Sequence, residues 1–265
     1  MPASSHAQVN HAEAATASVA AFPMRIAVIS DIHSNLHALE AVLTDIEREA
    51  PDEIWCLGDV VGYGPKPNEC ADIVRERAAV VLVGNHDLAA VGKLDTTDFG
   101  PLAAESARWT EDILGEEQAR WLRTLEPAAM RDGLELYHGS ARDPVWEYVL
   151  SEDVAFENLQ LTTAPIVLVG HSHLALALSW DGVRLDGGLA TGGTELETAG
   201  ARWLINPGSV GQPRDSDARA AWLLIDNAIG WAAFRRVPYP IKKTQAEMRA
   251  AGLPEDLATR LARGV

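Results

Sequence analysis

The chain has 265 residues, of which 47% are hydrophobic and 23% are charged, and its formal net charge is −16. This balance is typical of a soluble globular protein, and no apolar stretch approaches the roughly 20 residues of a membrane-spanning helix. The negative charge disfavours long nucleic acid as a partner, because such binding depends on Lys and Arg neutralising phosphates. A small anionic partner stays compatible with it, since bound divalent cations add positive charge locally.

Residues 1–22 are rich in Ala, Ser and His and lack the basic and continuous apolar regions of a secretory signal. We predict a disordered N-terminal tail there, followed by a single domain over residues 23–265 without linker or internal repeat. The two cysteines, Cys56 and Cys70, have neither a zinc-like nor a paired spacing. They predict free thiols in a reducing compartment, the cytoplasm.

The first third of the chain alternates strands and helices. Strands are predicted at 25–30, 53–57 and 79–83, and helices at 36–49 and 69–77. Such a β-α-β-α-β series favours right-handed crossovers and neighbouring, near-parallel strands.

The remainder is predicted to be helical first and mostly β afterwards. Helices are predicted at 88–91, 102–114, 116–125, 152–160, 241–250 and 254–262. Strands are predicted at 129–131, 134–138, 165–169, 174–180, 183–185, 201–205, 220–225 and 231–236. Asp-Gly pairs predict two hairpin turns, and residues 187–193 read as a glycine-rich loop. The simplest arrangement is two facing sheets with helices on both outer faces.

Histidine, aspartate and asparagine side chains follow the predicted strands. They are Asp31 and His33, Asp59, Asn85 with His86 and Asp87, His138, and His171 with His173. Because ligands bind at the carboxyl ends of strands in open α/β sheets, we expect these residues to converge on one edge.

These residue types suit a divalent metal, because imidazole and carboxylate bind Mn, Fe, Zn or Ni and no thiolate lies among them. Asp-x-His and His-x-His each direct alternate side chains the same way from an extended segment. The preceding Gly58, Gly84 and Gly170 allow sharp turns and close backbone approach. Two ions fit if one carboxylate bridges, and two ions can clamp a phosphate and lower the pKa of a bridging water.

Each motif alone is weak, since a lone Asp-x-His is usually an N-cap or turn and a lone His-x-His fits a surface strand. All of them together, in order and each after a β-like run, resemble the signature of the calcineurin-like metallophosphoesterases. The segments around Asp31, Asp59 and Asn206 are similar to its small bacterial and archaeal phosphodiesterase branch. The resemblance spans residues 24 to about 236 and implies a four-layer α-β-β-α sandwich.

The resemblance also implies roles for the residues. The first metal would be held by Asp31, His33, Asp59 and His173, and the second by Asp59, Asn85, His138 and His171, with Asp59 bridging. His86 resembles the catalytic histidine, which binds the phosphate or protonates the leaving oxygen. The implied activity is hydrolysis of a small phosphodiester or phosphomonoester by a metal-bridging water or hydroxide, with two divalent ions, Mn first and Fe, Ni or Zn as alternatives.

The chain departs from the phosphoprotein phosphatase branch. That branch has Gly-Asp-x-x-Asp-Arg-Gly, whereas here Gly62-Tyr63-Gly64 follow Val61, so the second Asp and the Arg are missing. A phosphodiesterase is therefore favoured over a protein phosphatase. Arg214 is a candidate for contacting phosphate, against the alternative of a surface salt bridge.

Three alternatives stay open. Ser172 after a strand resembles a hydrolase nucleophile elbow, but Leu174 stands where that motif has Gly. A catalytically silent scaffold of the same fold is a second, although every ligand position and His86 are filled. A nuclease is a third, and the acidic balance opposes it.

The substrate is not readable from these residues. Specificity is expected in residues 88–127 and 143–148, where Trp146 and Tyr148 stack on a base or, as we favour, simply pack. We interpret His37 as a solvated residue or one behind the ligands. The eight tryptophans leave an apolar homo-oligomer interface open.

Overall fold

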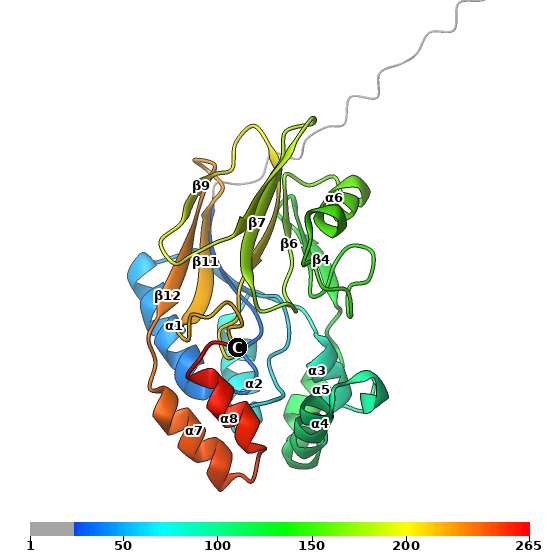
Figure 1. The fold of residues 1–265 in the computed structure, drawn as a ribbon, viewed down its shortest axis with the longest axis vertical. Helices are drawn as coiled ribbons and strands as arrows, with labels where there is room; N and C mark the ends of the chain where they lie inside the picture. The colour runs from blue at the N-terminus through cyan, green and yellow to red at the C-terminus, as the bar shows by residue number, and fades with distance from the viewer. Residues whose placement is uncertain (1–23) are drawn as a thin grey trace, which may run out of the picture.

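The computed structural model describes residues 24–265, and within this range the strands form two six-stranded sheets that face each other. Figure 1 shows the sheets side by side, with helices α1 and α6 on opposite outer sides and further helices below them. The predicted tail at residues 1–22 lies outside the described residues. No helix in residues 24–265 is long and apolar enough to cross a membrane.

The first sheet is built on the N-terminal β-α-β-α-β series. Its strands, in spatial order, are β3 (Val80–Val81), β2 (Glu53–Cys56), β1 (Arg25–Ile29), β11 (Ala220–Asp226), β12 (Trp231–Val237) and β9 (Glu195–Glu197). Strands β1, β2 and β3 are parallel, as predicted, whereas β11 and β12 are antiparallel to their neighbours. The carboxyl ends of the three parallel strands therefore share one edge of the sheet.

The second sheet has the order β4 (Ala128–Arg131), β5 (Leu134–Tyr137), β6 (Ile166–Leu168), β10 (Arg202–Pro207), β7 (Ala175–Trp180) and β8 (Leu185–Leu189). Its β5, β6 and β10 are parallel. Both predicted hairpins are present, as β4–β5 and β7–β8.

Three apolar layers hold the sheets and helices together. Residues such as Val28, Trp55 and Leu223 fill the space between the sheets. The outer face of the first sheet packs against α1 (Leu36–Glu49), α2 (Pro67–Arg77) and α5 (Glu116–Leu122). The outer face of the second packs against α6 (Glu152–Leu161). The predicted α-β-β-α order of layers is confirmed.

The remaining helices surround the end of the sandwich where the parallel strands stop. They are α3 (Asn85–Ala90), the 3₁₀ turn Thr96–Asp98, α4 (Pro101–Ile113), α7 (Ile241–Ala250) and α8 (Glu255–Leu261). In Figure 1, α7 and α8 lie on one side of this end and α3, α4 and α5 on the other. Tyr63, which lies in the long loop after β2, packs in the same apolar cluster as residues of α4, α7 and α8.

Helix α1 illustrates why the sequence reading succeeds where the apolar period is strong. Its buried positions Leu39, Val42 and Ile46 recur at helical spacing, and the Asn35 carboxamide oxygen accepts a hydrogen bond from the Ala38 N–H at 3.3 Å. The predicted and observed bounds are identical.

The glycine-rich loop predicted at residues 187–193 is wrong at its start, because Gly187 and Gly188 belong to β8 and pair with β7. A Cβ at Gly187 would overlap the Ala177 carbonyl, so close backbone approach explains the glycine better than a loop. The predicted strand at 183–185 is also wrong at its start. The Asp181 carboxylate accepts hydrogen bonds from the N–H groups of Val183 and Arg184 and makes them part of the turn. Strand β9 was missed.

Candidate metal centre

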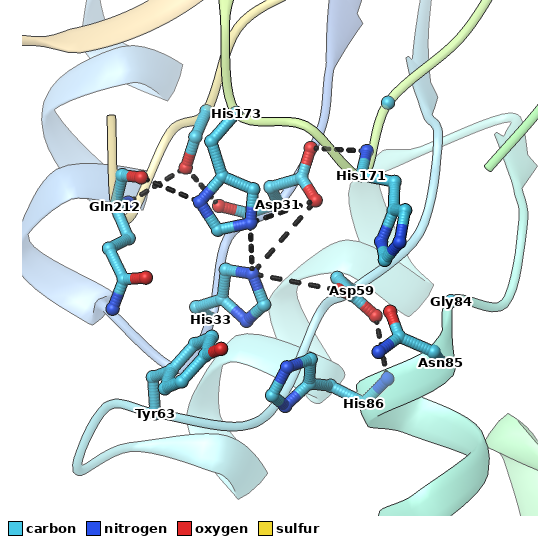
Figure 2. A network of polar contacts seen from close by, with 12 residues as sticks. Asp31, His33, Asp59, Tyr63, Gly84, Asn85, His86, His171, His173 and Gln212 are labelled. Carbon is cyan, nitrogen blue, oxygen red and sulfur yellow. Dashed lines mark hydrogen bonds and ion pairs between the residues drawn. The ribbon is translucent and has the colours of Figure 1, made fainter. Parts of the chain in front are cut away.

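The residues predicted to bind metal meet at the carboxyl ends of the parallel strands of both sheets. Asp31 and His33 follow β1 and Asp59 follows β2, while Asn85 is the first residue of α3. From the second sheet, His138 follows β5, and His171 and His173 follow β6. All seven are buried. Figure 2 shows most of them pointing toward one another from these separate elements.

Two groups of donor atoms are close enough to hold a cation. One comprises Asp31, His33, Asp59 and His173, and the other Asp59, His138 and His171, with each group's ligand atoms within 4.8 Å of one another. Asp59 belongs to both. Its Oδ2 lies 3.6 Å from His33 Nε2 and 3.6 Å from His138 Nε2.

Asn85 joins the second group, since its Oδ1 lies 3.3 Å from His138 Nε2. The sequence reading began this helix only at residue 88 and left Asn85, His86 and Asp87 outside it, which is wrong. They form the first turn of α3, whose start is fixed by the Asp87 carboxylate accepting the Gly84 N–H at 3.0 Å.

The tautomers of three histidines are set by backbone carbonyls. The Nδ1 atoms of His33, His138 and His173 lie 3.2, 2.9 and 2.7 Å from the carbonyl oxygens of Val61, Leu57 and Gln212. A carbonyl oxygen only accepts, so each Nδ1 carries the proton and each neutral ring presents the Nε2 lone pair. This arrangement is typical of metal-binding histidines.

The Nε2 lone pairs of His33 and His173 and two carboxylate oxygens point into the cluster, where the described residues offer them no hydrogen-bond donor. His33 Nε2 and His173 Nε2 face each other at 2.9 Å, and Asp31 Oδ1 lies 3.5 Å from His173 Nε2. Within the described chain, the buried Asp31 Oδ1, Asp59 Oδ2 and His171 Nε2 have no hydrogen-bond partner. Orphaned acceptors of this kind are expensive to bury unless a cation satisfies them. The donor set therefore fits divalent metal.

The titration of the cluster points the same way. Burial raises the pKa of the Asp31 carboxyl to about 7 and that of Asp59 well above its ordinary value. Burial lowers the pKa of His171 to about 2 and those of His33 and His173 well below the usual range. Without a cation, burial therefore disfavours both the ionised carboxylates and the protonated imidazoles. A bound metal ion stabilises the ionised carboxylates and so lowers their pKa values.

The backbone of the cluster is not extended, contrary to the prediction for Asp-x-His and His-x-His. Asp31, His33, Asp59, His171 and His173 all have left-handed φ values, between 50° and 62°. Each such residue other than glycine costs roughly 1–3 kcal/mol. The turns bring alternate side chains to one place after the strand has ended, so the prediction of convergence holds although its geometry differs.

All three preceding glycines are required for space. A Cβ at Gly84 would overlap the Asp59 carboxylate, and a Cβ at Gly170 would overlap the Ser30 hydroxyl. A Cβ at Gly58 would lie 2.9 Å from both the Gly84 nitrogen and His138 Nδ1, and its φ of 100° also favours glycine.

His86 lies beside the donor groups without belonging to them. Its ring is 5.0 Å from the His33 ring, 4.3 Å from the Tyr63 ring and 5.0 Å from the Phe99 ring, centroid to centroid. Its backbone N–H donates to Asp59 Oδ1 at 2.9 Å, and burial lowers its pKa well below the usual range.

Arg214 reaches the same region. Its Nη2 donates to Gln212 Oε1 at 3.0 Å and contacts the Tyr63 hydroxyl at 3.5 Å, and it forms no salt bridge with a carboxylate of residues 24–265. Its charge also contributes to the lowered pKa values of His33, His86 and His173. The surface salt bridge considered for it is absent from the described residues.

Several residues of the site were missed or read differently from the sequence. Tyr148 stacks on His171 with the rings 4.0 Å apart and 13° from parallel, so it packs, as favoured, while staying 43% exposed. Asp87 accepts the Val61 N–H at 2.9 Å and fixes the loop after β2. Its place directly after His86 was the available signal.

Two sequence-based alternatives lose their support. The Ser172 hydroxyl contacts the Asn206 amide at 3.0 Å and the Leu174 N–H, and no histidine of the described chain hydrogen-bonds it as a base would. His37 is buried and contacts Glu247 of α7 at 3.0 Å, so it is not solvated.

The fold and the clustered carboxylates and imidazoles define a protein of the metallophosphoesterase class. The calcineurin-like phosphoesterase superfamily domain matches residues 24–228. The chain belongs to this family, as its motifs predicted.

Similar proteins come from bacteria and archaea. The crystal structure of a metallophosphoesterase from Sphaerobacter thermophilus matches with a TM-score of 0.83 and 42% identity, covering 92% of this chain and 100% of that chain. An uncharacterized protein of Methanocaldococcus jannaschii is 37% identical over 242 residues, 89% of this chain and 96% of its own.

A symmetrical bis(5′-nucleosyl)-tetraphosphatase of Neisseria meningitidis is 31% identical over 136 residues, which are 49% of this chain and 48% of that enzyme. The chain thus spans about half the length of this relative.

Proposed function

We propose that the chain, as a single domain over residues 23–265, is a dinuclear metal-dependent phosphoesterase. The observation that carries the proposal is the pair of donor groups that share Asp59. One buried carboxylate whose Oδ2 lies 3.6 Å from imidazole nitrogens of both groups suits a bridge between two ions.

Seven residues would hold the ions: Asp31, His33, Asp59 and His173 the first, and Asp59, Asn85, His138 and His171 the second. Bound there, two divalent ions supply Lewis acidity toward a phosphoryl oxygen and generate a nucleophile from water near neutral pH. The carbonyls of Val61, Leu57 and Gln212 keep three imidazoles in the ligating tautomer.

His86 is the proposed catalytic residue. Its backbone is tied to Asp59, so the ring stays at a fixed position beside the donors, and Tyr63 and Phe99 limit its rotation. A bound phosphate anion favours the protonated ring and raises its pKa from the lowered value. His86 then hydrogen-bonds the phosphate or gives a proton to the leaving oxygen.

The proposed substrate is a small phosphate ester, with a diester preferred over a phosphoprotein. The Arg of the protein phosphatase motif is absent, and Arg214 is proposed to contact a phosphate group of the substrate. The partial similarity to tetraphosphatases supports a small substrate. We propose Mn as the native metal, and the buried free thiols Cys56 and Cys70 are consistent with work in the cytoplasm.

The test starts from protein stripped with chelator and reconstituted separately with Mn, Fe, Ni or Zn. Hydrolysis of bis(4-nitrophenyl) phosphate and of 4-nitrophenyl phosphate is measured, together with bound metal by elemental analysis. We expect about two ions per chain and restored activity with a diester preference. Asp59→Asn should lose metal and activity, whereas His86→Ala should lose activity, by about 10²–10⁴-fold, and keep both ions.

The competing function is that of a catalytically silent metal-binding scaffold. It predicts two bound ions with no hydrolysis of either ester by any of the four metals. That result would overturn the proposed activity, and loss of metal from His86→Ala would overturn the role given to His86.

A further inference from the structure

Two arginines from distant parts of the chain meet beside the candidate centre. Arg214 follows β10 in the loop after Gln212, and Arg260 lies near the end of α8. Arg214 Nη2 and Arg260 Nη1 donate to the same Gln212 Oε1, at 3.0 and 3.2 Å. Both guanidinium carbons also approach the Tyr63 ring, at 5.9 and 5.3 Å from its centroid. The two cations are therefore neighbours, held by one amide oxygen and one aromatic ring.

This pair differs from the other arginines close by in sequence. Arg219 pairs with Asp217 at 2.6 Å, and Arg236 forms a buried ion pair with Asp215. Arg214 and Arg260 have no ion pair with a carboxylate in residues 24–265. The charge of Asp256 acts to raise the pKa of Arg260, but the two side chains form no salt bridge. In a chain of net charge −16, two adjacent unpaired guanidiniums are unusual enough to need a reason.

Holding the two charges together is unfavourable without an anion. Burial lowers the pKa of Arg260 below its ordinary value, and the charge of Arg214 contributes in the same direction. A guanidinium has five N–H donors, and the described contacts of Arg260 use one of them on Gln212. The unused donors and uncompensated charge suit a phosphate, which accepts paired N–H bonds from arginine.

The pair lies next to the place where the reacting phosphate is proposed to bind. The Tyr63 ring that both arginines approach is itself 4.3 Å from the His86 ring and 4.7 Å from the His33 ring. Burial raises the pKa of Tyr148, and the charge of Arg214 opposes this rise, so Arg214 acts on Tyr148 as well. In Figure 2, the side chains of Tyr63 and His33 lie between Gln212 and His86.

We propose that Arg214 and Arg260 form a subsite for a second phosphate group of the substrate, adjacent to the scissile one. The inference rests on the proposed phosphoesterase function and narrows its substrate class to small esters that contain a polyphosphate chain. Successive phosphates of such a chain share one bridging oxygen, so a neighbour of the scissile phosphate lies only a few ångströms from it.

A purely structural role is the alternative, in which the arginines support Tyr63 through cation–π contact and so orient His86. The two roles differ in what they affect. Loss of support for Tyr63 slows hydrolysis of every substrate, whereas loss of a phosphate subsite slows only substrates that carry a second phosphate.

The experiment compares diadenosine tetraphosphate, followed by chromatography of its products, with bis(4-nitrophenyl) phosphate, which has a single phosphate. The kcat/KM ratio of the two substrates is measured for wild type, Arg260→Gln and Arg260→Lys with Mn in excess. Arg263→Gln removes the same charge from an exposed position three residues on and serves as the matched control. Melting temperatures check that each variant is folded.

We expect Arg260→Gln to lower the ratio at least tenfold, mainly through KM of the tetraphosphate, with partial recovery in Arg260→Lys and no change in Arg263→Gln. An equal loss for both substrates would overturn the subsite and assign Arg260 to positioning Tyr63. Wild type that hydrolyses the diester but not the tetraphosphate would also overturn it while leaving the proposed function intact. Hydrolysis of neither substrate would contradict the proposed function itself.

Discussion

The donor cluster (Asp31, His33, Asp59, His138, His171 and His173) and the rim above it (Phe99, Trp146, Tyr148 and Arg214) are built on opposite principles. The cluster is buried, has left-handed backbone at five residues and leaves acceptors without partners. The rim is partly exposed. Its aromatic side chains contact one another or His171, and Arg214 contacts Gln212 and Tyr63. Strain and unpaired acceptors persist where a ligand is expected to compensate for them, whereas a rim of loops adapts to what binds.

The comparison predicts that the cluster tolerates almost no added volume. Gly84→Ala has an allowed backbone conformation, yet its Cβ would overlap the Asp59 carboxylate. We expect activity to fall by about 10³-fold, because displacing Asp59 forfeits several kcal/mol of transition-state stabilisation, and metal content to fall below two ions per chain. Hydrolysis rates and elemental analysis test this.

Gly100→Ala is the control for that change, because a Cβ at Gly100 meets nothing within 4 Å. Its activity should match wild type within twofold. Gly84→Ala with full activity and two ions would show that the cluster is not rigid in the way the comparison requires.

The donor cluster and the rim differ in how well the sequence alone predicts them. The cluster residues were predictable because each follows a strand, and parallel strands end at one edge whatever the details of the turn. Their left-handed backbone was not predictable, since it accompanies contacts between segments far apart in sequence. The His33 N–H donates to the Asp59 carbonyl at 3.0 Å, and the His171 N–H donates to Asp31 Oδ2 at 3.2 Å. The start of α3 was missed because Gly84 N-caps it without a side chain and only Asp87 marks it.

The surroundings of the cluster were largely unreadable for a physical reason. The contacts of Arg260 with Gln212 and of His37 with Glu247 join residues 48 and 210 positions apart. Local patterns such as period, capping and turn residues carry no information about such pairs. Fold and metal ligands are therefore predictable here, whereas the residues that select a substrate emerge only from tertiary structure.

A second prediction concerns the stability of the metal-free protein, which Asp59 is expected to lower although it is needed to bind metal. Asp59→Asn keeps the acceptor for the His86 N–H and replaces the orphaned oxygen with an N–H donor that faces the lone pairs of His33 and His138. In chelator at pH 8 we expect the variant to be more stable than wild type by about 1–3 kcal/mol, the cost of an unsatisfied buried acceptor. Denaturant unfolding measures it, and added Mn should stabilise only wild type. Lower stability of the metal-free variant would contradict the account of the cluster as strained.

A third prediction concerns the contact between the two regions, where Tyr148 stacks on His171. Tyr148→Ala removes the stacked ring and should raise the metal dissociation constant of the group containing His171 about tenfold, since outer contacts fix ligand orientation. Tyr148→Phe keeps the ring and should retain wild-type affinity. Titration of stripped protein with Mn gives both values, and equal affinity of the Ala variant would mean that the rim does not orient the cluster.

The smallest effect is expected where the rim is anchored. Glu147 accepts hydrogen bonds from Arg142 and Ser140 and fixes the loop that carries Trp146, and the hydrogen bond from Arg142 lowers its pKa to about 2. Because the folded-state pKa lies below the ordinary value, this contribution is complete above about pH 4.5 and is lost as the pH falls toward 2. Glu147→Gln should therefore lower the melting temperature by about 2–4 °C at pH 6, and the difference should shrink below pH 4.5. Glu157→Gln, which removes the other, more exposed partner of Arg142, should change it less. If the difference in melting temperature between Glu147→Gln and wild type does not depend on pH, the loop is held by packing. The rim would then share the rigidity of the cluster.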